Sequence, residues 1–474
     1  MFTDNEFPGD IRMIGTIDSP IPQNIQFLRP KDFLNKVQLY DDGIEPTDIK
    51  QGCLGDCYFL ASLAALSEKP KTIQKMIKSL GNGKYEINIF FKGKERKVII
   101  DDVIPCVNGI PFFSHNHGDE LWVMLLEKAY AKLHKNYGNM EGGMPFVALS
   151  DLTGMPVKRF LTKDLDKDEL FKRIMKYDKK DYYMCANVPD VPDVDLQKDY
   201  GLVEEHCYTV IGAYEIEGHK LLKIRNPWGE CEWKGKWRDD DPNWTAAMKK
   251  ELNVVEANDG LYFMEIDDFV KHFEDLVVVY YKEEWKHFGT KRFEMKSKQM
   301  AIDIEAEGDC IFSLQQSRKG EKIGMKMWCV NSDNICIGGL TEKAFTNATI
   351  MKGRKVKIPS KGKYRIIVET HSSFVAKLPL KFTICGISKH PIQFSDPVAL
   401  DGANRIPYID KQQAETSERC PACKQIVPEK GVARTKIGTY HIKCFVCSAC
   451  GQQLSGKFGM RGDKILCPDC FAKK

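Results

Sequence analysis

The arrangement of apolar and polar positions in the first part of the chain predicts a mixture of helices and strands. Residues 57–69 form an apolar run, rich in Ala and Leu, that stops at Pro70 as a buried helix does. Apolar residues also recur at helical spacing in 120–130. The segments 85–91 and 97–102 instead carry the β-branched and aromatic residues typical of strands.

From about residue 150 onward, strand patterns dominate. The segments 208–214 and 220–225 flank a Glu-Gly turn, which predicts an antiparallel hairpin. Residues 290–390 contain short strand patterns between Gly, Pro, Asn and Asp residues, the spacing of a β-sandwich. We therefore expect an α+β fold with two lobes of mixed structure followed by a β-sandwich.

The same patterns suggest where the domains begin and end. A chain of 474 residues is long enough for about three domains. Cysteines crowd into its last part, which marks a separate C-terminal module. The predicted parts are an irregular lead-in at 1–24, a first lobe at 25–150, a second lobe at 151–285, a β-sandwich at 290–390, a polar linker at 391–415 and the small module at 416–474.

Composition narrows the setting in which the chain works. No apolar run approaches the roughly 20 residues needed to cross a bilayer, and the acidic N-terminus lacks the apolar core of a signal peptide. We therefore expect a cytoplasmic protein, in which 17 cysteines should be reduced, metal-bound or catalytic. The formal net charge of +4 is too small to indicate nucleic acid or a membrane as partner.

Cys57 is a candidate nucleophile. A Gly-Asp turn delivers it to the start of the apolar helix, where unpaired N–H groups and the helix dipole should lower a thiol pKa. His206, at the entrance to the first hairpin strand, is a candidate base, and Asn226, just after the second strand, could orient it. The alternatives are a structural cysteine, a satisfied histidine and a simple Asn-Pro turn.

Three sequence blocks, in the right order, resemble the calpain family of papain-like cysteine proteases. They are Gln51-Gly52-Cys53-Leu54-Gly55-Asp56-Cys57, Gly201 to Val210, and Arg225-Asn226-Pro227-Trp228-Gly229 with the acidic and aromatic residues that follow. The resemblance covers roughly residues 25–285. It implies the two-lobed fold and makes Cys57 the nucleophile, His206 the general base and Asn226 the orienting residue.

The resemblance also implies supporting roles and shows two departures. Gln51 would donate to the oxyanion hole, and Trp228 would shield the His–Asn pair from water. Gly142 and Gly143 match a segment whose backbone pairs with substrate, although a simple turn explains them equally well. Tyr58 stands where most of the family has tryptophan, and Glu205 where it usually has glycine.

Two calcium sites are implied by the same resemblance, each built from carboxylates and carbonyls. The first would use the carbonyls of Asp41 and Gly43 and the carboxylates of Asp48 and Glu120. The second would use Glu232, Asp239, Ala257 and Asp259, with Leu261 standing where the family usually has an acid. Solvated acidic loops are the alternative. Bound calcium would favour closure of the two lobes.

The C-terminal module carries eight metal-ligand residues in four close pairs, the number that two tetrahedral zinc sites require. Their spacing resembles that of a LIM domain. That resemblance assigns one zinc ion to Cys420, Cys423, His441 and Cys444, and a second to Cys447, Cys450, Cys467 and Cys470. Such a small module should fold only with its metal.

The sequence therefore predicts a calcium-regulated cysteine endopeptidase that cuts proteins through an acyl-enzyme and is targeted by a LIM module. The alternative is a LIM adaptor with a vestigial core. A third possibility is acyl transfer of the transglutaminase type. That chemistry conventionally uses an Asp to orient the histidine, so the presence of Asn226 argues against it. The expected partners are protein substrates and a LIM-binding protein, for which a cytoskeletal protein is a candidate. Phospholipid contact through the β-sandwich is an alternative to a purely structural role, and we expect no nucleic acid.

Overall fold

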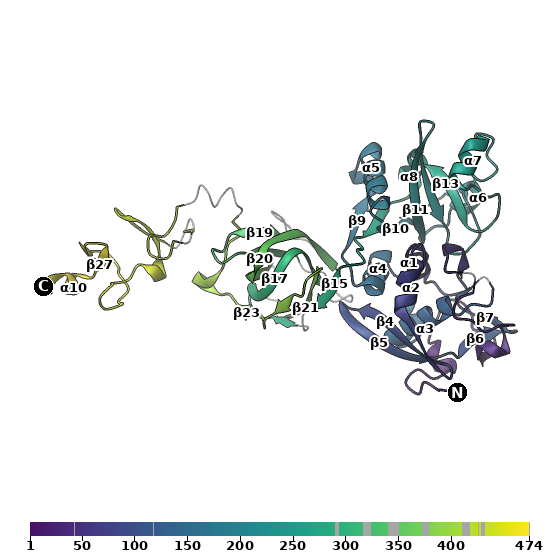
Figure 1. Ribbon diagram of the computed structural model, residues 1–474, viewed down its shortest axis with the longest axis horizontal. Helices are drawn as coiled ribbons and strands as arrows, with labels where there is room; N and C mark the ends of the chain where they lie inside the picture. The colour runs from purple at the N-terminus through teal and green to yellow at the C-terminus, as the bar shows by residue number, and fades with distance from the viewer. Residues whose placement is uncertain are drawn as a thin grey trace. The chain divides into compact units, whose positions relative to one another are not determined.

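The computed structural model describes residues 1–41, 43–116, 118–289, 293–315, 324–339, 350–371, 379–409, 418–424, 426–427 and 432–473. The chain divides into two compact units, Met1–Glu284 and Trp285–Lys474 (Figure 1). No helix among the described residues is long and apolar enough to cross a membrane.

The first lobe is built around one fully buried helix, α1. Its sheets contain β3 (Ile77–Gly81), β4 (Lys84–Phe91) and β5 (Lys94–Asp101); β1 (Ile25–Leu28), β6 (Ile104–Val107) and β7 (Ile110–Pro111); and the pair β2 (Ile49–Lys50) and β8 (His115–Asn116). Its helices are α1 (Cys57–Ser67), α2 (Pro70–Met76), α3 (Trp122–His134) and α4 (Pro145–Thr153). Every residue of α1 after Cys57 is buried, as expected of a helix that is apolar all round.

Two details of this lobe differ from the sequence prediction. The chain becomes helical again at Pro70, because proline is favoured at the first position of a helix and begins α2 there. The lead-in at 1–24 has little regular structure but packs into the lobe. Asp4 is buried and pairs with Lys132 at 2.7 Å, and Phe7 and Ile14 are buried as well.

The second lobe is an antiparallel sheet of order β13-β12-β11-β10-β14-β9 with helices around it (Figure 1). The strands are β9 (Val157–Leu161), β10 (Tyr183–Val188), β11 (His206–Ile216), β12 (His219–Arg225), β13 (Leu261–Glu265) and β14 (Asp275–Val279), and the helices are α5 (Lys167–Asp178), α6 (Leu196–Tyr200), α7 (Ala246–Leu252) and α8 (Ile266–His272). The predicted hairpin is confirmed, because β11 pairs with β12 across the turn. The helices of this lobe were not predicted.

The two lobes meet where α1 packs against β10 and β11. The hydroxyl of Thr209, on β11, donates a hydrogen bond to the carbonyl oxygen of Ala61, on α1, at 2.7 Å. The N-terminal end of α1 therefore lies beside the beginning of β11. This contact brings Cys57 and His206 to the same end of the interface.

The second unit begins with an antiparallel β-sheet domain. Its described strands are β15 (Lys286–Gly289), β16 (Phe293–Met295), β17 (Gln299–Gln315), β18 (Met325–Val330), β19 (Cys336–Gly339), β20 (Ile350–Thr370), β21 (Leu380–Ser388), β22 (Gln393–Phe394) and β23 (Val398–Ala399). Strands β17 and β20 are longer than predicted, because bulges near Gly308 let the pairing continue around a bend. Residues from both halves of β17, such as Ile302 and Phe312, share one core.

The predicted linker at 391–415 differs from the structure over its first part. β22 and β23 both pair with β17, and Leu400 and Ile406 are buried, so residues up to 409 belong to the sheet domain. Short strands of this kind leave little periodicity in a sequence. Residues 410–417, which span the rest of the predicted linker and the start of the predicted module, lie outside the described residues.

The described residues of the C-terminal module include two small hairpins and a short α-helix. Its elements are β24 (Val432–Thr435), β25 (Gly438–His441), β26 (Gly459–Arg461), β27 (Lys464–Leu466) and α10 (Pro468–Ala472). Its core is small and includes Tyr440, Phe445 and Leu454 together with several of the cysteines.

Candidate active site

Cys57 is the first residue of α1 and is half-buried. Burial raises the pKa of its thiol to about 11 and outweighs the hydrogen bond from the backbone N–H of Cys207, while the charge of Asp56 raises it further. The sequence, through the helix dipole, predicted instead that the pKa of this thiol would be lowered. The physical reason for the difference is desolvation, which disfavours the thiolate and cannot be read from the position in the helix.

His206 and Asn226 lie side by side at the end of the β11–β12 hairpin. His206 Nε2 is 2.8 Å from Asn226 Oδ1. Asn226 is fully buried and its amide is fixed from both ends: Oδ1 also accepts from the backbone N–H of Trp228 at 3.1 Å, and Nδ2 donates to the carbonyl of Cys231 at 3.0 Å. Burial lowers the pKa of His206 to about 4.

Trp228 covers this pair. Its indole ring lies 5.0 Å from the His206 ring, centroid to centroid. The neighbouring Pro227 accepts a hydrogen bond from the backbone N–H of Gln51 at 3.1 Å, which ties the two lobes together beside the pair. Within the described residues, no hydrogen bond joins Cys57 Sγ to His206.

The side chain of Gln51 is held in place by its amide. Nε2 donates to the carbonyl oxygen of Leu54 at 2.7 Å, whereas the buried Oε1 has no hydrogen-bond partner. One N–H of the amide is therefore used in the loop before Cys57, and the second remains for another acceptor.

The Tyr58 ring explains why one of the two residues in the predicted substrate-binding segment is a glycine. A Cβ atom on Gly143 would lie 2.4 Å from the Tyr58 ring, and the Tyr58 hydroxyl donates to the carbonyl of Met140 at 3.0 Å. Gly142 has a positive φ of 65° and open space around it. Both glycines are exposed, so their backbone is accessible.

Glu205 occupies a conformation that favours glycine. Its φ is +46°, in the left-handed region that costs an L-residue energy, and its side chain is exposed directly before His206. The neighbouring Glu204 has one buried carboxylate oxygen without a hydrogen-bond partner.

The acids of the first predicted calcium site lie near one another. The carboxylate of Glu120 accepts from the backbone N–H of Asp41 at 2.7 Å and from Trp122 Nε1 at 2.9 Å. Burial, with added repulsion from Asp48 and Asp41, raises the pKa of Glu120. Gly43 has a φ of 140° and open space around it.

The acids of the second predicted site also interact. Burial and the charges of Asp239 and Asp259 raise the pKa of Glu232 to about 7, while burial and the Asp259 charge raise that of Asp239 to about 6 against a hydrogen bond from the Ala257 backbone. Glu232 Oε1 already accepts from the backbone N–H groups of Asp259 and Gly260, each at 2.8 Å. In the part of the chain that the structure describes, the carboxylates of neither calcium set form a group of three as close as the zinc ligands.

A cavity of about 470 Å³ is bordered by acids from both predicted calcium sites. Asp48 from the first lobe and Asp239 and Asp259 from the second all line it. Arg225 is fully buried and interacts electrostatically with Asp48 and Asp259, with Nη2 donating to the carbonyl of Ile49 at 2.7 Å and with Nε and Nη1 unpartnered. No sequence pattern indicates a role for this arginine, because its burial between the lobes leaves no local signal.

The eight metal-ligand residues of the C-terminal module form two groups. Within each group the ligand atoms lie within 4.8 Å of one another. The sulfur atoms of Cys423 and Cys444 lie 3.4 and 3.9 Å from His441 Nδ1, and those of Cys450 and Cys467 lie 3.8 Å apart. A zinc tetrahedron with ~2.3 Å Zn–S bonds has edges of roughly 3.5 to 3.8 Å, so both groups fit zinc.

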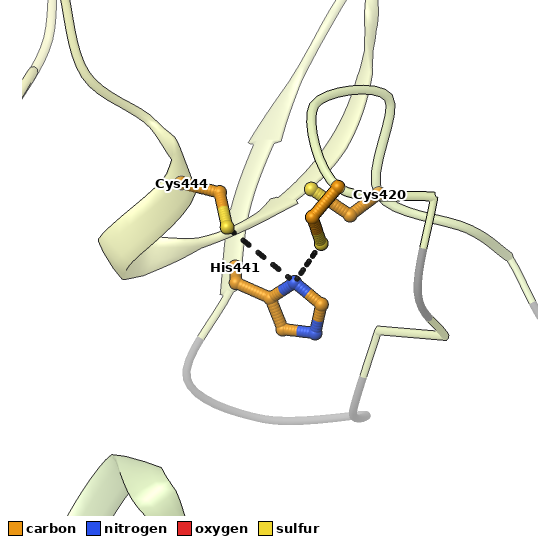
Figure 2. A group of neighbouring side chains, drawn as sticks. Cys420, His441 and Cys444 are labelled. Atoms are coloured by element: carbon orange, nitrogen blue, oxygen red, sulfur yellow. Dashed lines mark hydrogen bonds between the residues drawn. The ribbon is translucent and has the colours of Figure 1, made fainter. Parts of the chain in front are cut away.

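The orientation of His441 agrees with this fit. Figure 2 shows its Nδ1 atom turned toward the neighbouring sulfur atoms. The opposite nitrogen, Nε2, lies 3.0 Å from the carbonyl oxygen of Ile426. A proton on Nε2 would leave Nδ1 free to bind metal, the arrangement usual for histidine ligands.

Comparison with known proteins gives a consistent picture. A model of the calpain family of cysteine proteases matches residues 2–280, and a LIM domain model matches residues 420–474. Among curated relatives, the calpain-type cysteine protease DEK1 of Zea mays is 34% identical over 299 residues, covering 58% of this chain and 14% of that protein. Calpain-8 of Rattus norvegicus is 33% identical over 298 residues, covering 59% of this chain and 42% of that protein. The chain thus spans less than half the length of these relatives.

A solved structure of the cysteine protease and lectin-like domains of Cwp84 from Clostridium difficile has a TM-score of 0.24 and 11% identity, covering 80% of this chain and 83% of that one. The score is too low to inform the fold. The family model and the curated relatives define the class as a papain-like cysteine protease. The chain belongs to the calpain family, and it carries a LIM domain at its C-terminal end.

Proposed function

We propose that this chain is an active, calcium-regulated cysteine endopeptidase that makes limited cuts in protein substrates. The observation that carries the proposal is the buried hydrogen bond between His206 Nε2 and Asn226 Oδ1, 2.8 Å long and covered by Trp228. It stands at the end of the interface where Cys57 begins α1. A hydrogen-bonded imidazole next to a cysteine at a helix start is what thiol catalysis requires.

The hydrogen bonds around Asn226 determine where the imidazole proton resides. Because the amide nitrogen of Asn226 donates to Cys231, its oxygen faces His206 and can only accept. His206 must therefore carry its proton on Nε2, which leaves a lone pair on Nδ1. This tautomer is the one that can take the proton of the Cys57 thiol.

The remaining steps follow from these positions. Cys57 would attack the peptide carbonyl, and the free N–H of the Gln51 amide and the backbone N–H of Cys57 would donate to the developing oxyanion. His206 would then protonate the leaving amine, and water would release the second product from the acyl-enzyme. The exposed backbone of Gly142 and Gly143 would pair with the extended substrate.

Calcium regulation is proposed because the catalytic pair is uncharged in this arrangement. With pKa values of about 11 for Cys57 and about 4 for His206, both groups are neutral at pH 7. A thiolate–imidazolium pair needs the two groups to approach, since each charge would then stabilise the other.

The predicted calcium residues have the right chemistry to promote that approach. Acidic residues from both lobes border one cavity, namely Asp48 from the first lobe and Asp239 and Asp259 from the second. Calcium would supply the positive charge that lets these acids come together. A closed arrangement, in which residues of both lobes bind the calcium ion, would then be favoured over the arrangement of the lobes in this structure.

The LIM domain is proposed to recruit a protein partner, with a cytoskeletal protein as a candidate. Two zinc ions held by its two ligand groups would give it a rigid surface for that purpose. A cytoplasmic location suits the free cysteines of the first unit. Contact of the β-sheet domain with phospholipid is a further proposal that would place the protease near a membrane.

Casein cleavage measured across a calcium titration tests the proposal. We expect calcium-dependent cleavage by the wild type and by Cys53→Ala, and none by Cys57→Ala. Equal turnover by wild type and Cys57→Ala would contradict the assignment of the nucleophile. The absence of cleavage by wild type at any calcium concentration would favour a LIM adaptor with a vestigial core.

A further inference from the structure

A second thiol lies against the candidate nucleophile and has no role in the proposed reaction. Cys207 directly follows His206 on β11, and its side chain points to the opposite face of the strand from Tyr208, which packs in the core of the second lobe. Thr209 shares the face of Cys207 and bonds to Ala61 of α1. Cys207 therefore faces the helix that begins with Cys57.

Helix and strand geometry place the two cysteines opposite each other. Four residues of α-helix separate Cys57 from Ala61, a rise of about 6 Å, and two residues of strand separate Cys207 from Thr209, a rise of about 6.6 Å. Since Thr209 touches Ala61, Cys207 falls opposite Cys57 when the two segments run in the same direction. The hydrogen bond from the Cys207 backbone N–H to the Cys57 thiol shows that they do.

The two thiols differ in their access to solvent. Cys57 is half-buried at the site where substrate would enter, whereas the side chain of Cys207 is 2% exposed. A small oxidant can therefore reach Cys57 from solvent, while the buried Cys207 is shielded from it. A third cysteine, Cys185, is fully buried opposite Thr209 on β10 and shares a hydrogen bond with the Cys207 thiol, so it is the competing partner for Cys207.

We propose that Cys207 is a resolving cysteine, which converts peroxide-oxidised Cys57 into a reversible Cys57–Cys207 disulfide. The proposal rests on the proposed function only in treating Cys57 as the reactive thiol. The disulfide would block the nucleophile and covalently cross-link the first lobe to the second. Irreversible loss of the catalytic sulfur would thereby be avoided.

The chemistry balances in two steps. The Cys57 thiol loses its proton and its sulfur attacks one oxygen of hydrogen peroxide, so that the S–O bond of the sulfenic acid Cys57–SOH forms, the O–O bond breaks, and the hydroxide released leaves with the thiol proton as water. The Cys207 thiol then attacks that sulfur, so that an S–S bond forms, the S–O bond breaks and water leaves. A cellular dithiol reverses the reaction by thiol–disulfide exchange, becoming oxidised as the two cysteines are reduced.

Other thiols near Cys57 are directed elsewhere. Cys53 precedes the turn into α1 and donates its thiol hydrogen to the carbonyl of Phe112 at 3.2 Å. Cys231 donates to the carbonyl of Gly201 at 3.8 Å. Cys53 lies four residues from Cys57 in the sequence and is therefore the natural matched control.

The test uses the full zinc-loaded chain treated with hydrogen peroxide, followed by peptide mapping without reduction. We expect a cross-linked peptide pair containing Cys57 and Cys207 in wild type and in Cys53→Ala. In Cys207→Ala we expect Cys57 to proceed to sulfinic acid. This readout needs no peptidase activity, so an inactive protein would leave it intact and would refute only the proposed function.

A second readout is the recovery of casein cleavage after dithiothreitol. Wild type and Cys53→Ala should regain activity, and Cys207→Ala should lose it permanently. The proposal is overturned by a Cys53–Cys57 or Cys185–Cys207 cross-link as the main product, or by equal recovery in Cys207→Ala. If the alanine variant fails to fold, as judged by its thermal transition, Cys207→Ser replaces it in the same two measurements.

Discussion

At the start of α1, two buried acids compete for one proton. Asp56, directly before Cys57, is fully buried and shares a hydrogen bond with the equally buried Glu127. Burial raises the pKa of Glu127 to about 7, against hydrogen bonds from Ser114. Ionisation of both carboxylates would place two buried negative charges side by side, which is unfavourable, so at least one holds a proton in the folded state.

This pair predicts a pH dependence of stability. The folded-state pKa of Glu127, about 7, lies above its usual value of 4.5. The folded protein therefore binds a proton that the unfolded chain releases, and the stabilisation is present at low pH and lost as pH rises through about 7. The free energy of unfolding should fall by up to about 1.4 kcal/mol per pH unit in this window from this group.

Glu127→Gln should flatten that dependence, because an amide cannot ionise. Urea denaturation of the wild type and the variant between pH 5 and pH 7 measures it. An identical pH slope in both proteins would show that Glu127 does not hold the proton.

Backbone strain at Glu205 gives a second prediction at the scale of one residue. Glu205→Gly should raise the free energy of unfolding by about 0.5 to 1 kcal/mol, because relief of the left-handed conformation exceeds the added entropy of the unfolded chain. Glu204→Gly is the matched control, since its φ is not positive, and it should destabilise instead. A loss of stability in both variants would contradict the assigned strain.

At the scale of elements, the sequence predicted the helices and strands in which apolar side chains recur at one regular spacing. The helix α1 and the β11–β12 hairpin are of this kind, and the hairpin explains why His206 and Asn226 could be paired from sequence alone. The long strands β17 and β20 were divided in the prediction, because glycines and prolines that usually end strands sit here in bulges.

The candidate site shows the same division between local and long-range information. The contact of α1 with β11 joins segments about 150 residues apart, so neither the neutral state of Cys57 nor the position of Cys207 beside it has a local signal. The pKa of Cys57 was predicted in the wrong direction for this reason: helix position is local, but desolvation depends on the whole interface.

Arg225, at the end of β12, provides a prediction about calcium. Its buried charge lies near Asp48 and Asp259, and burial lowers its own pKa to about 10 while these acids raise it. Replacing it with Met should tighten calcium binding by about tenfold, or about 1.4 kcal/mol, since a cation would no longer be repelled by a poorly screened charge.

Calorimetric titration with calcium in a Cys57→Ala background measures this effect without proteolysis. Lys223 lines the cavity from a half-exposed position, so Lys223→Met should change the affinity less, because solvent screens this charge. Weaker or unchanged binding in Arg225→Met would mean that calcium does not occupy this cavity.

At the scale of the whole molecule, the two units should respond differently to metal removal. The LIM domain has a small core that includes its own ligands, so we expect its folding to depend on zinc, whereas the protease unit has a large apolar core of its own. Chelation should abolish hydrogen-exchange protection in residues 432–473 and leave that of residues 1–284 unchanged.

Elemental analysis provides the control for that experiment. We expect two zinc ions per chain in wild type and one in Cys420→Ala. A zinc-free chain that still protects the amides of β24 and β25 would contradict the coupling of metal to folding.

The central claim is that Cys57 is the nucleophile and that His206 activates it. Its most direct test is covalent labelling with a peptidyl chloromethyl ketone at saturating calcium, with the modified residue located by mass spectrometry. The account predicts one label, on Cys57, formed rapidly in wild type and at least about a hundredfold more slowly in His206→Ala, the lower range for loss of a general base. Labelling of Cys53 instead, or of Cys57 at equal rates in both proteins, would contradict it.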